Sequence, residues 1–183
     1  LLIVFSLFSE YLTPYDPYLQ DLSSAKLPPS AEHLLGTDRY GRDMLSRVIA
    51  GSRTSIFSTL ILVAVITALG TTIGVFCGWN GGWPDAVLMR ISDMFLAFPG
   101  LVFALAVAGV LGGGLQNAML ALAAISWPKY ARLARSQTLA LKEAVWMKAA
   151  RLSGSGTAKL IFKHVLPNII GPILVTAVLD IGT

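Results

Sequence analysis

Residues 142–168 read KEAVWMKAARLSGSGTAKLIFKHVLPN, a basic and glycine-containing segment that lies between two hydrophobic stretches. Four aliphatic residues recur every three to four positions here and share one face of a predicted helix: Leu141, Val145, Ala149 and Leu152. Gly154 and Gly156 are expected to end this helix, because glycine readily adopts left-handed backbone angles. Pro167 fits the start of the next helix, since proline lacks the amide proton that an interior helical residue donates.

The segment therefore predicts a short helix, a bend and a return into an apolar helix. Such a protrusion can seat in a groove of a soluble partner, with the small residues Ala149 and Ala150 allowing close approach. It can also lie as an amphipathic helix on an anionic lipid surface. The pattern alone is consistent with both interpretations.

The composition is that of a membrane protein. The chain is 55% hydrophobic and 13% charged, whereas soluble domains are about 25% charged. No charged residue occurs between Arg53 and Asp85 or between Asp93 and Lys129. A membrane-spanning helix needs about 20 apolar residues, so these runs predict transmembrane helices rather than the buried helices of a large soluble protein.

We predict five spanning segments: the tail of a first span at 1–12, then 55–78, 91–111, 115–134 and the start of a fifth at 166–183. Both ends of the chain lie in apolar sequence, which favours truncated helices over a signal peptide. The cluster Gly112–Gly114 predicts a tight turn between the third and fourth spans.

The loop charges predict the orientation. The loop after the fourth predicted span is rich in Lys and Arg, whereas acids offset the basic residues between 11 and 52. The more basic loop is expected on the cytoplasmic side. The net charge of +4 mostly reflects this asymmetry and gives no reason to expect nucleic-acid binding.

Part of the basic segment resembles the cytoplasmic-loop signature of bacterial ABC-transporter importer permeases, which is Glu-Ala-Ala, three residues, Gly, nine residues, Ile-x-Leu-Pro. The matching residues are Ala149, Ala150, Gly154, Leu166 and Pro167. Lys148 stands at the Glu position and His164 at the Ile position. The resemblance implies an ATPase-coupling loop that consists of Lys148, Ala149, Ala150, Arg151, Gly154, Gly156, Leu166 and Pro167.

A second stretch narrows the family. Residues 33–43, HLLGTDRYGRD, followed by Ser46 and Arg47, resemble the segment before the second span in one permease type of dipeptide, oligopeptide and nickel importers. The resemblance implies an all-α polytopic membrane protein with the type I ABC importer permease fold, of which this chain holds about five of six transmembrane helices. Residues 1–53 would contain the end of the first span and an extracytoplasmic segment. Residues 54–183 would form the permease domain, with the cytoplasmic coupling loop at 136–167.

The resemblance also implies the partners. A related second permease subunit would complete a heterodimer, two cytoplasmic ATPase subunits would dock on the coupling loops, and an extracytoplasmic substrate-binding protein would deliver the substrate. The location would be the bacterial inner membrane, where lipid surrounds the spans. ATP would be bound by the partner ATPases, so this chain needs no cofactor.

The residues themselves give no sign of catalysis. A phosphate-binding loop needs Gly-x4-Gly-Lys-Ser/Thr, and the glycines at 109–114 have no lysine after them. No metal-ligand motif or nucleophile motif is present in the sequence, and Cys77 is the only cysteine. We therefore predict a transport subunit rather than an enzyme, with no resident metal.

Three intramembrane features are candidates for a function. Asp180 lies about 20 Å along the fifth helix from Pro167 at 1.5 Å per residue, where a carboxylate is costly. It can line the translocation path or form a structural hydrogen bond. Pro99 is expected to break the third span and is a candidate gating kink. Arg90 and Asp93 are expected to form a structural pair.

The resemblance implies that the substrate is nickel ion or a small peptide. Resemblances at 127–132, 150–156 and 179–182 favour the nickel branch over the dipeptide branch. The alternatives from other classes are a secondary transporter, which would need ion-coupling polar residues in several spans, and a membrane scaffold that recruits a soluble partner.

Overall fold

The computed structural model describes residues 6–182, and it divides into two compact units at residues 60 and 61. Within the described residues the only regular elements are helices, together with a single bridge between Thr37 and Asp43. The predicted all-α class is therefore confirmed. Of the predicted first span, residues 1–5 lie outside the described residues, as does Thr183 at the end of the fifth.

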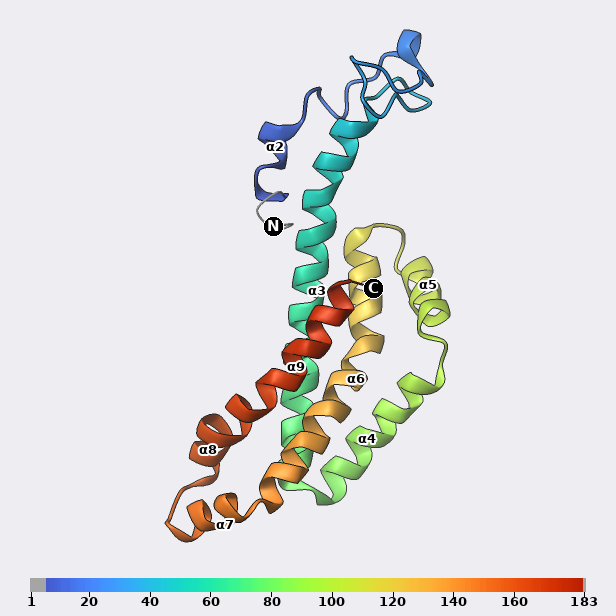
Figure 1. Ribbon diagram of the computed structural model, residues 1–183. Coiled ribbons are helices and arrows are strands. Elements are labelled where there is room, and N and C mark those ends of the chain that lie inside the picture. Colours follow the sequence, from blue (N-terminus) through green and yellow to red (C-terminus); the bar gives the residue numbers. More distant parts are fainter. Residues whose placement is uncertain (1–5, 183) are drawn as a thin grey trace. The chain divides into compact units, whose positions relative to one another are not determined.

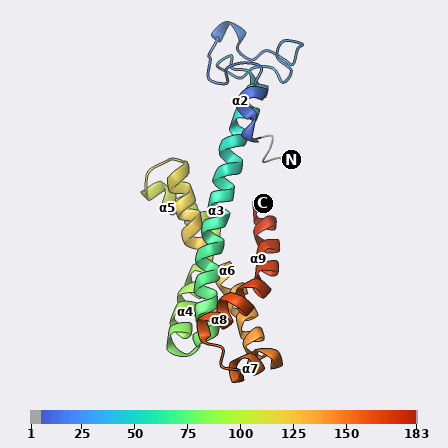
Figure 2. The same ribbon diagram turned by 90° about the vertical axis from the view of Figure 1, so that its left-hand side faces the viewer.

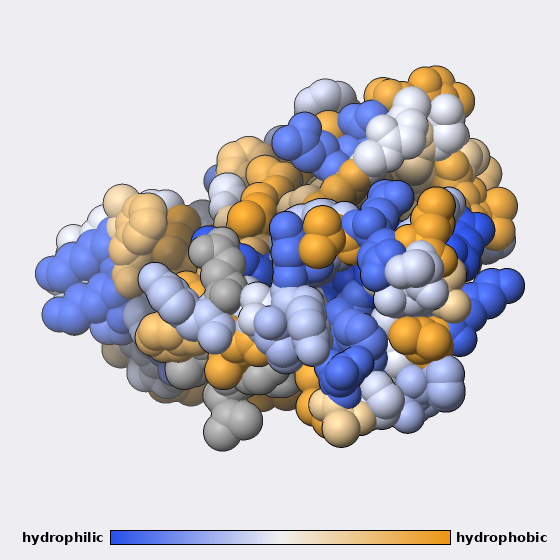
Figure 3. Space-filling model, turned by 90° about the horizontal axis from the view of Figure 1, so that it is seen from above, coloured by the Kyte–Doolittle hydropathy of each residue, from blue (hydrophilic) through white to orange (hydrophobic). Residues whose placement is uncertain are grey.

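The first unit holds α2 (Ser9–Leu12), the short 3-10 helix η1 (Leu22–Ser24) and the first part of α3 (Met44–Asn80). Between α2 and α3 the chain forms a long loop (Figure 1). Seen from above, hydrophilic residues gather over this loop, with hydrophobic residues scattered among them (Figure 3). Such a mixed surface is typical of a segment in water.

The second unit continues with α3 and contains α4 (Gly82–Ala97), α5 (Gly100–Val110) and α6 (Leu115–Glu143). Its last elements are α7 (Val145–Leu152), α8 (Thr157–Leu160), the π-helix η2 (Ile161–Val165) and α9 (Leu166–Ile181). In both ribbon views α6 lies between α5 and α9 (Figures 1 and 2). Its central place makes α6 the helix on which the unit is built.

The main core of the second unit joins α3, α6, α7, α8 and α9. Its fully buried side chains include Tyr130 from α6, Met147 from α7, Leu160 from α8 and Ile169 from α9. A smaller cluster of Ala104, Ala121 and Ile125 joins α5 to α6. The short α7 is therefore anchored in the same core as the long helices.

Two described helices are long and apolar enough to cross a membrane, Met44–Asn80 and the continuous run Thr157–Ile181. A third span results if α4 and α5 are counted together, although they are bent by 95° at the break between them. The break at Phe98 and Pro99 confirms the kink predicted there. The helix over the predicted fourth span, α6, is not among these candidates; it extends to Glu143, and ion pairs described below hold its charged second half.

Candidate functional site

The coupling segment, which we define as residues 141–168, begins where α6 ends. Ala144 is extended, with φ −61° and ψ 140°, and separates α6 from α7. Its carbonyl accepts hydrogen bonds from the amides of Met147 at 3.0 Å and Lys148 at 3.1 Å, which start the first turn of α7. Leu141 therefore lies on α6 rather than on the short helix, which corrects the predicted four-residue stripe.

A complete Schellman motif ends α7. Gly154 has φ +81°, and its amide donates to the Arg151 carbonyl at 3.0 Å, while the amide of Ser155 donates to the Ala150 carbonyl at 3.2 Å. This pattern satisfies helix carbonyls that would otherwise have no partner. Gly156 has φ −68° and ψ 157°, which any residue can adopt, so only Gly154 has the predicted left-handed conformation.

The two faces of α7 have different surroundings. Met147 is fully buried in the core and Ala150 packs against it. The opposite face carries Val145 and Leu152, whose exposed fractions are 84% and 90%. An aliphatic side chain loses about 1.5–3 kcal/mol of burial energy when it stays in water. The structure therefore presents an uncovered apolar face on an anchored helix.

The remaining residues of the predicted coupling loop are distributed over this segment. Lys148 and Ala149 are exposed, and the Lys148 ammonium lies 2.9 Å from the carboxylate of Glu143. Its hydrogen bond and positive charge lower the pKa of the Glu143 carboxyl. Leu166 is partly buried at the start of α9, next to the exposed Pro167.

A π-helix, Ile161–Val165, leads directly into α9 just before Pro167. The amide of Leu166 donates to the Ile161 carbonyl across a π-turn, and the side-chain amide of Asn168 donates to the His164 carbonyl at 2.6 Å. A π-turn inside a helix often occurs at functional sites. α9 begins at Leu166 with Pro167 in its first turn, as predicted, but it continues a helical run that starts at Thr157.

Trp79, at the end of α3, connects α3 to the coupling segment. Its carbonyl accepts a hydrogen bond from the Lys142 ammonium at 2.6 Å, and the Arg151 guanidinium lies 4.7 Å from the centre of its ring. A cation at a helix C-terminus is favourable, as is a guanidinium over an indole ring. Neither contact was predicted from the sequence.

Ion pairs hold the charged second half of α6 against α4 and α9. Lys129 lies 2.5 Å from Asp180, whose second oxygen accepts from the Tyr130 hydroxyl at 2.7 Å. Arg135 binds both oxygens of Asp85 at 2.5 and 2.6 Å. The predicted fourth span ended at 134, before Arg135, whereas the helix continues past it.

The sequence predicted a pair of Asp93 with Arg90. In the structure Asp93 pairs instead with Arg132 of α6. A contact between two helices distant in sequence replaces the expected pair within one helix. Asp180 makes the structural contacts that were one of its two predicted roles, and a role in the translocation path stays a prediction.

A ridge of glycines on α3 was also missed. A Cβ atom on Gly70, Gly74 or Gly78 would lie 2.2–2.9 Å from atoms of α6. Small residues at a spacing of four let helices approach closely in membranes. The signal was present in the sequence as Gly-x3-Gly-x3-Gly within the predicted second span.

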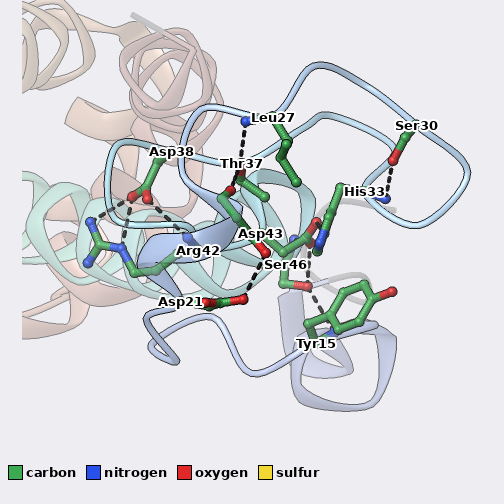
Figure 4. A network of polar contacts seen from close by, with 11 residues as sticks. Tyr15, Asp21, Leu27, Ser30, His33, Thr37, Asp38, Arg42, Asp43 and Ser46 are labelled. Atoms are coloured by element: carbon green, nitrogen blue, oxygen red, sulfur yellow. Dashed lines mark hydrogen bonds and ion pairs between the residues drawn. The ribbon is translucent and has the colours of Figure 1, made fainter.

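In the first unit, the Gly-Thr-Asp stretch forms a hydrogen-bonded loop before α3 (Figure 4). Asp43 caps α3 by accepting bonds from the amide and hydroxyl of Ser46, both at 2.7 Å, and from His33 at 2.9 Å. Asp38 accepts from the amides of Tyr40 at 2.8 Å and Arg42 at 3.1 Å. These contacts explain why acids and a serine stand at these spacings.

Comparison with known proteins identifies the same family as the sequence resemblance. A family model described as binding-protein-dependent transport system inner membrane component matches residues 70–183. The chain is 43% identical to a probable D,D-dipeptide transport system permease protein of Escherichia coli, over 100% of this chain and 61% of that protein. It is 41% identical to a nickel transport system permease protein of Escherichia coli, over 100% of this chain and 66% of that protein.

A glutathione transport system permease protein of Pectobacterium atrosepticum is 39% identical, over 100% of this chain and 61% of that protein. The chain thus spans about three fifths to two thirds of the length of these relatives. The resemblance predicted from the sequence and the inner-membrane location are confirmed. The chain belongs to the family of binding-protein-dependent transport system inner membrane components.

Proposed function

We propose that the chain is the permease subunit of an ATP-driven, binding-protein-dependent importer, in which it forms half of the translocation path. The names of its relatives, all transport system permease proteins, support a transport subunit rather than an enzyme. Residues 1–53 would contribute the end of a first span and an extracytoplasmic segment, and residues 54–183 the transmembrane domain. A second permease subunit would supply the other half of the path.

The observation that carries this proposal is the apolar outer face of α7. Val145 and Leu152 are exposed while Met147 on the opposite face is fully buried. A cytoplasmic ATPase that covers this face would move α7, and the shared core would pass the movement to α6 and α9. The ATPases can drive transport in this way only if they bind two states of the permease with different free energies.

The competing interpretation of α7 is an amphipathic helix on lipid, and a scaffold that recruits another soluble protein would also use this face. Two variants of the full-length permease, Val145→Ser and Leu152→Ser, test the proposal by co-purification of the ATPases. Leu111→Ser is the matched control, because Leu111 is half exposed at the end of α5, in the turn before the start of α6 and away from α7. Loss of the ATPases in the α7 variants alone supports docking, and retention in all three refutes it.

The proposed substrate is nickel ion, with small peptides as the second candidate. The resemblances at 127–132, 150–156 and 179–182 favour nickel, whereas the 43% identity to a D,D-dipeptide permease favours peptides. No group of three or more His, Cys, Asp or Glu side chains that could hold a metal ion occurs among the described residues.

Uptake into vesicles decides between the substrates. Vesicles with the full-length permease, its second permease, the ATPases and the binding protein would be offered labelled nickel and a labelled dipeptide, with and without ATP. ATP-dependent nickel uptake supports the first candidate and dipeptide uptake alone the second. ATP-independent uptake would instead support a secondary transporter.

The break at Pro99 is proposed as a flexible element of the gate. The 95° bend between α4 and α5 lies directly at this residue. Pro99→Ala would restore an amide donor and favour a continuous helix, so ATP-dependent uptake should fall. Uptake and coupled ATPase activity equal to wild type would remove Pro99 from the gate.

A further inference from the structure

A polar hollow of about 480 Å³ lies where α3, α6 and α7 end. Its lining comes from the end of α3, the end of α6, the end of α7 and the turn that leads into α8: Trp79, Asn80, Lys142, Arg151, Ser155, Gly156, Thr157 and Leu160. Leu160 is 1% exposed and forms part of the core, so the hollow rests on a packed base. We propose that this hollow binds a phosphate group, carried by an anionic lipid or free in solution.

The charge balance of the hollow is the first argument. Lys142 and Arg151 are its charged lining residues, and no carboxylate lines it. The Glu143 carboxylate interacts electrostatically with both cations, but the cation that it binds directly is Lys148, at 2.9 Å. Lys129, Arg132 and Arg135 on the same helix each have an aspartate partner, whereas Lys142 and Arg151 form no ion pair within residues 6–182.

The two cations also share one contact residue. Both contact Trp79, Lys142 through the backbone carbonyl at 2.6 Å and Arg151 over the ring at 4.7 Å. Like charges that converge on one residue repel each other, and an anion between them would remove this repulsion. Burial of Trp79, which is 7% exposed, keeps both contacts in place.

The free donors of the hollow suit a phosphate. An ammonium has three protons and Lys142 uses one on Trp79, so two remain. The guanidinium of Arg151 lies over the Trp79 ring and makes no hydrogen bond to the described residues, so its N–H donors remain. The hydroxyls of Ser155 and Thr157 make no hydrogen bond to the described part of the chain. Ammonium, guanidinium and hydroxyl donors that converge from three segments match an acceptor with several oxygens.

The position of the hollow is compatible with a lipid source. It lies at the ends of apolar helices, and basic pockets between such helices bind anionic head groups. A bound phosphate would connect the ends of α6 and α7 through Lys142 and Arg151. The site would thereby fix the orientation of α7, although phosphate binding itself does not depend on the proposed ATPase partner.

Native mass spectrometry of the full-length protein in detergent tests the proposal. The protein would be titrated with dioleoylphosphatidylglycerol, with dioleoylphosphatidylcholine as the zwitterionic reference. The double variant Lys142→Gln/Arg151→Gln should bind the phosphatidylglycerol about tenfold or more weakly, because two charge-assisted contacts are lost. Lys159→Gln/Lys163→Gln is the control, since it removes the same charge from exposed residues outside the hollow.

Ser155→Ala/Thr157→Ala removes two hydroxyls and leaves both contacts to Trp79. It therefore tests phosphate binding if Lys142→Gln/Arg151→Gln does not fold. Its binding should also weaken, by a smaller factor. Competition by millimolar inorganic phosphate in the wild type would identify a free anion as the ligand, and absence of competition would identify the lipid. Equal losses in the hollow and control variants, or no loss in either hollow variant, would overturn the proposal.

Discussion

Gly154 has a backbone conformation that only glycine adopts without strain. With φ +81° it forms the turn that ends α7, and a Cβ atom there would meet no neighbouring atom. Gly154→Ala would therefore strain the backbone without a steric clash against neighbouring residues. The substitution should lower the free energy of unfolding by about 1–2 kcal/mol. Thermal unfolding of the full-length protein in detergent measures it.

Gly156 provides the matched control two residues later. It has φ −68°, and a Cβ atom there also has open space. Gly156→Ala should leave the unfolding temperature unchanged or raise it slightly, because alanine restricts the unfolded chain. Equal destabilisation by both substitutions would contradict the assigned role of Gly154.

Asp38 and Asp43 make the loop before α3 sensitive to acid. Burial raises the pKa of each carboxyl, but hydrogen bonds from Arg42 to Asp38 and from Ser46 to Asp43 outweigh it, so both pKa values lie below the ordinary 3.8. A lowered pKa contributes stability that is complete above the ordinary value and is lost as the pH falls through the folded value. The loop should therefore loosen below about pH 4.

Hydrogen exchange of the loop, corrected for the intrinsic pH dependence, measures this effect. The amides of Tyr40, Arg42 and Ser46 should lose protection in acid, because each donates to one of the two carboxylates. Asp38→Asn should already expose the amide of Arg42 at neutral pH. Protection that is independent of pH in the wild type would refute the role of these carboxylates.

At the scale of elements, α3 and α6 are in contact through the glycine ridge. A Cβ atom on Gly74 would lie 2.2 Å from the Ala131 carbonyl oxygen and 2.7 Å from the Ala134 Cβ. Backbone and Cβ atoms cannot rotate away, so Gly74→Ala must push the helices apart. We expect a loss of roughly 1–3 kcal/mol in the free energy of unfolding.

Gly51 lies on the same helix and serves as the control, because a Cβ atom there has nothing within 4 Å. Gly51→Ala should stabilise the protein by about 0.5–1 kcal/mol through its helix propensity. Thermal unfolding of both variants in detergent gives the comparison. A harmless Gly74→Ala would show that α3 and α6 are not in close contact in the membrane.

The contact of Lys129 and Tyr130 with Asp180 connects α6 to α9. If this contact is structural, Asp180→Lys should destabilise the protein, because two cations then face each other. The exchange Lys129→Asp/Asp180→Lys should restore most of the lost stability. Unfolding temperature and substrate uptake would be measured on the same samples. Restored stability without restored uptake would instead support the predicted place of Asp180 in the translocation path.

At the scale of the whole molecule, the local features were predictable from the sequence. Uninterrupted apolar runs predicted the long helices, and Phe98-Pro99-Gly100 predicted the break between α4 and α5. The contacts between helices were not predictable. The partners of Asp85, Asp93 and Asp180 lie 39 to 51 residues away in sequence.

The same limit explains the error about α6. Its basic residues suggested that the helix ends near residue 134, because charges are costly within a membrane. The structure shows that aspartates from neighbouring helices pair with Lys129, Arg132 and Arg135, which allows the helix to continue to Glu143. Periodicity and composition report on a single helix, so a charge that another helix neutralises cannot be recognised from them.

The central claim is that α7 transmits the action of cytoplasmic ATPases to the permease, and cysteine crosslinking at Leu152 tests it most directly. Leu152→Cys would be introduced into the full-length permease in membranes that contain the ATPases, with Leu111→Cys as reference and the buried Cys77 retained. We predict a crosslink to an ATPase from position 152 alone, with a yield that changes when ATP is bound. A yield at position 152 no higher than that at position 111 would contradict the account.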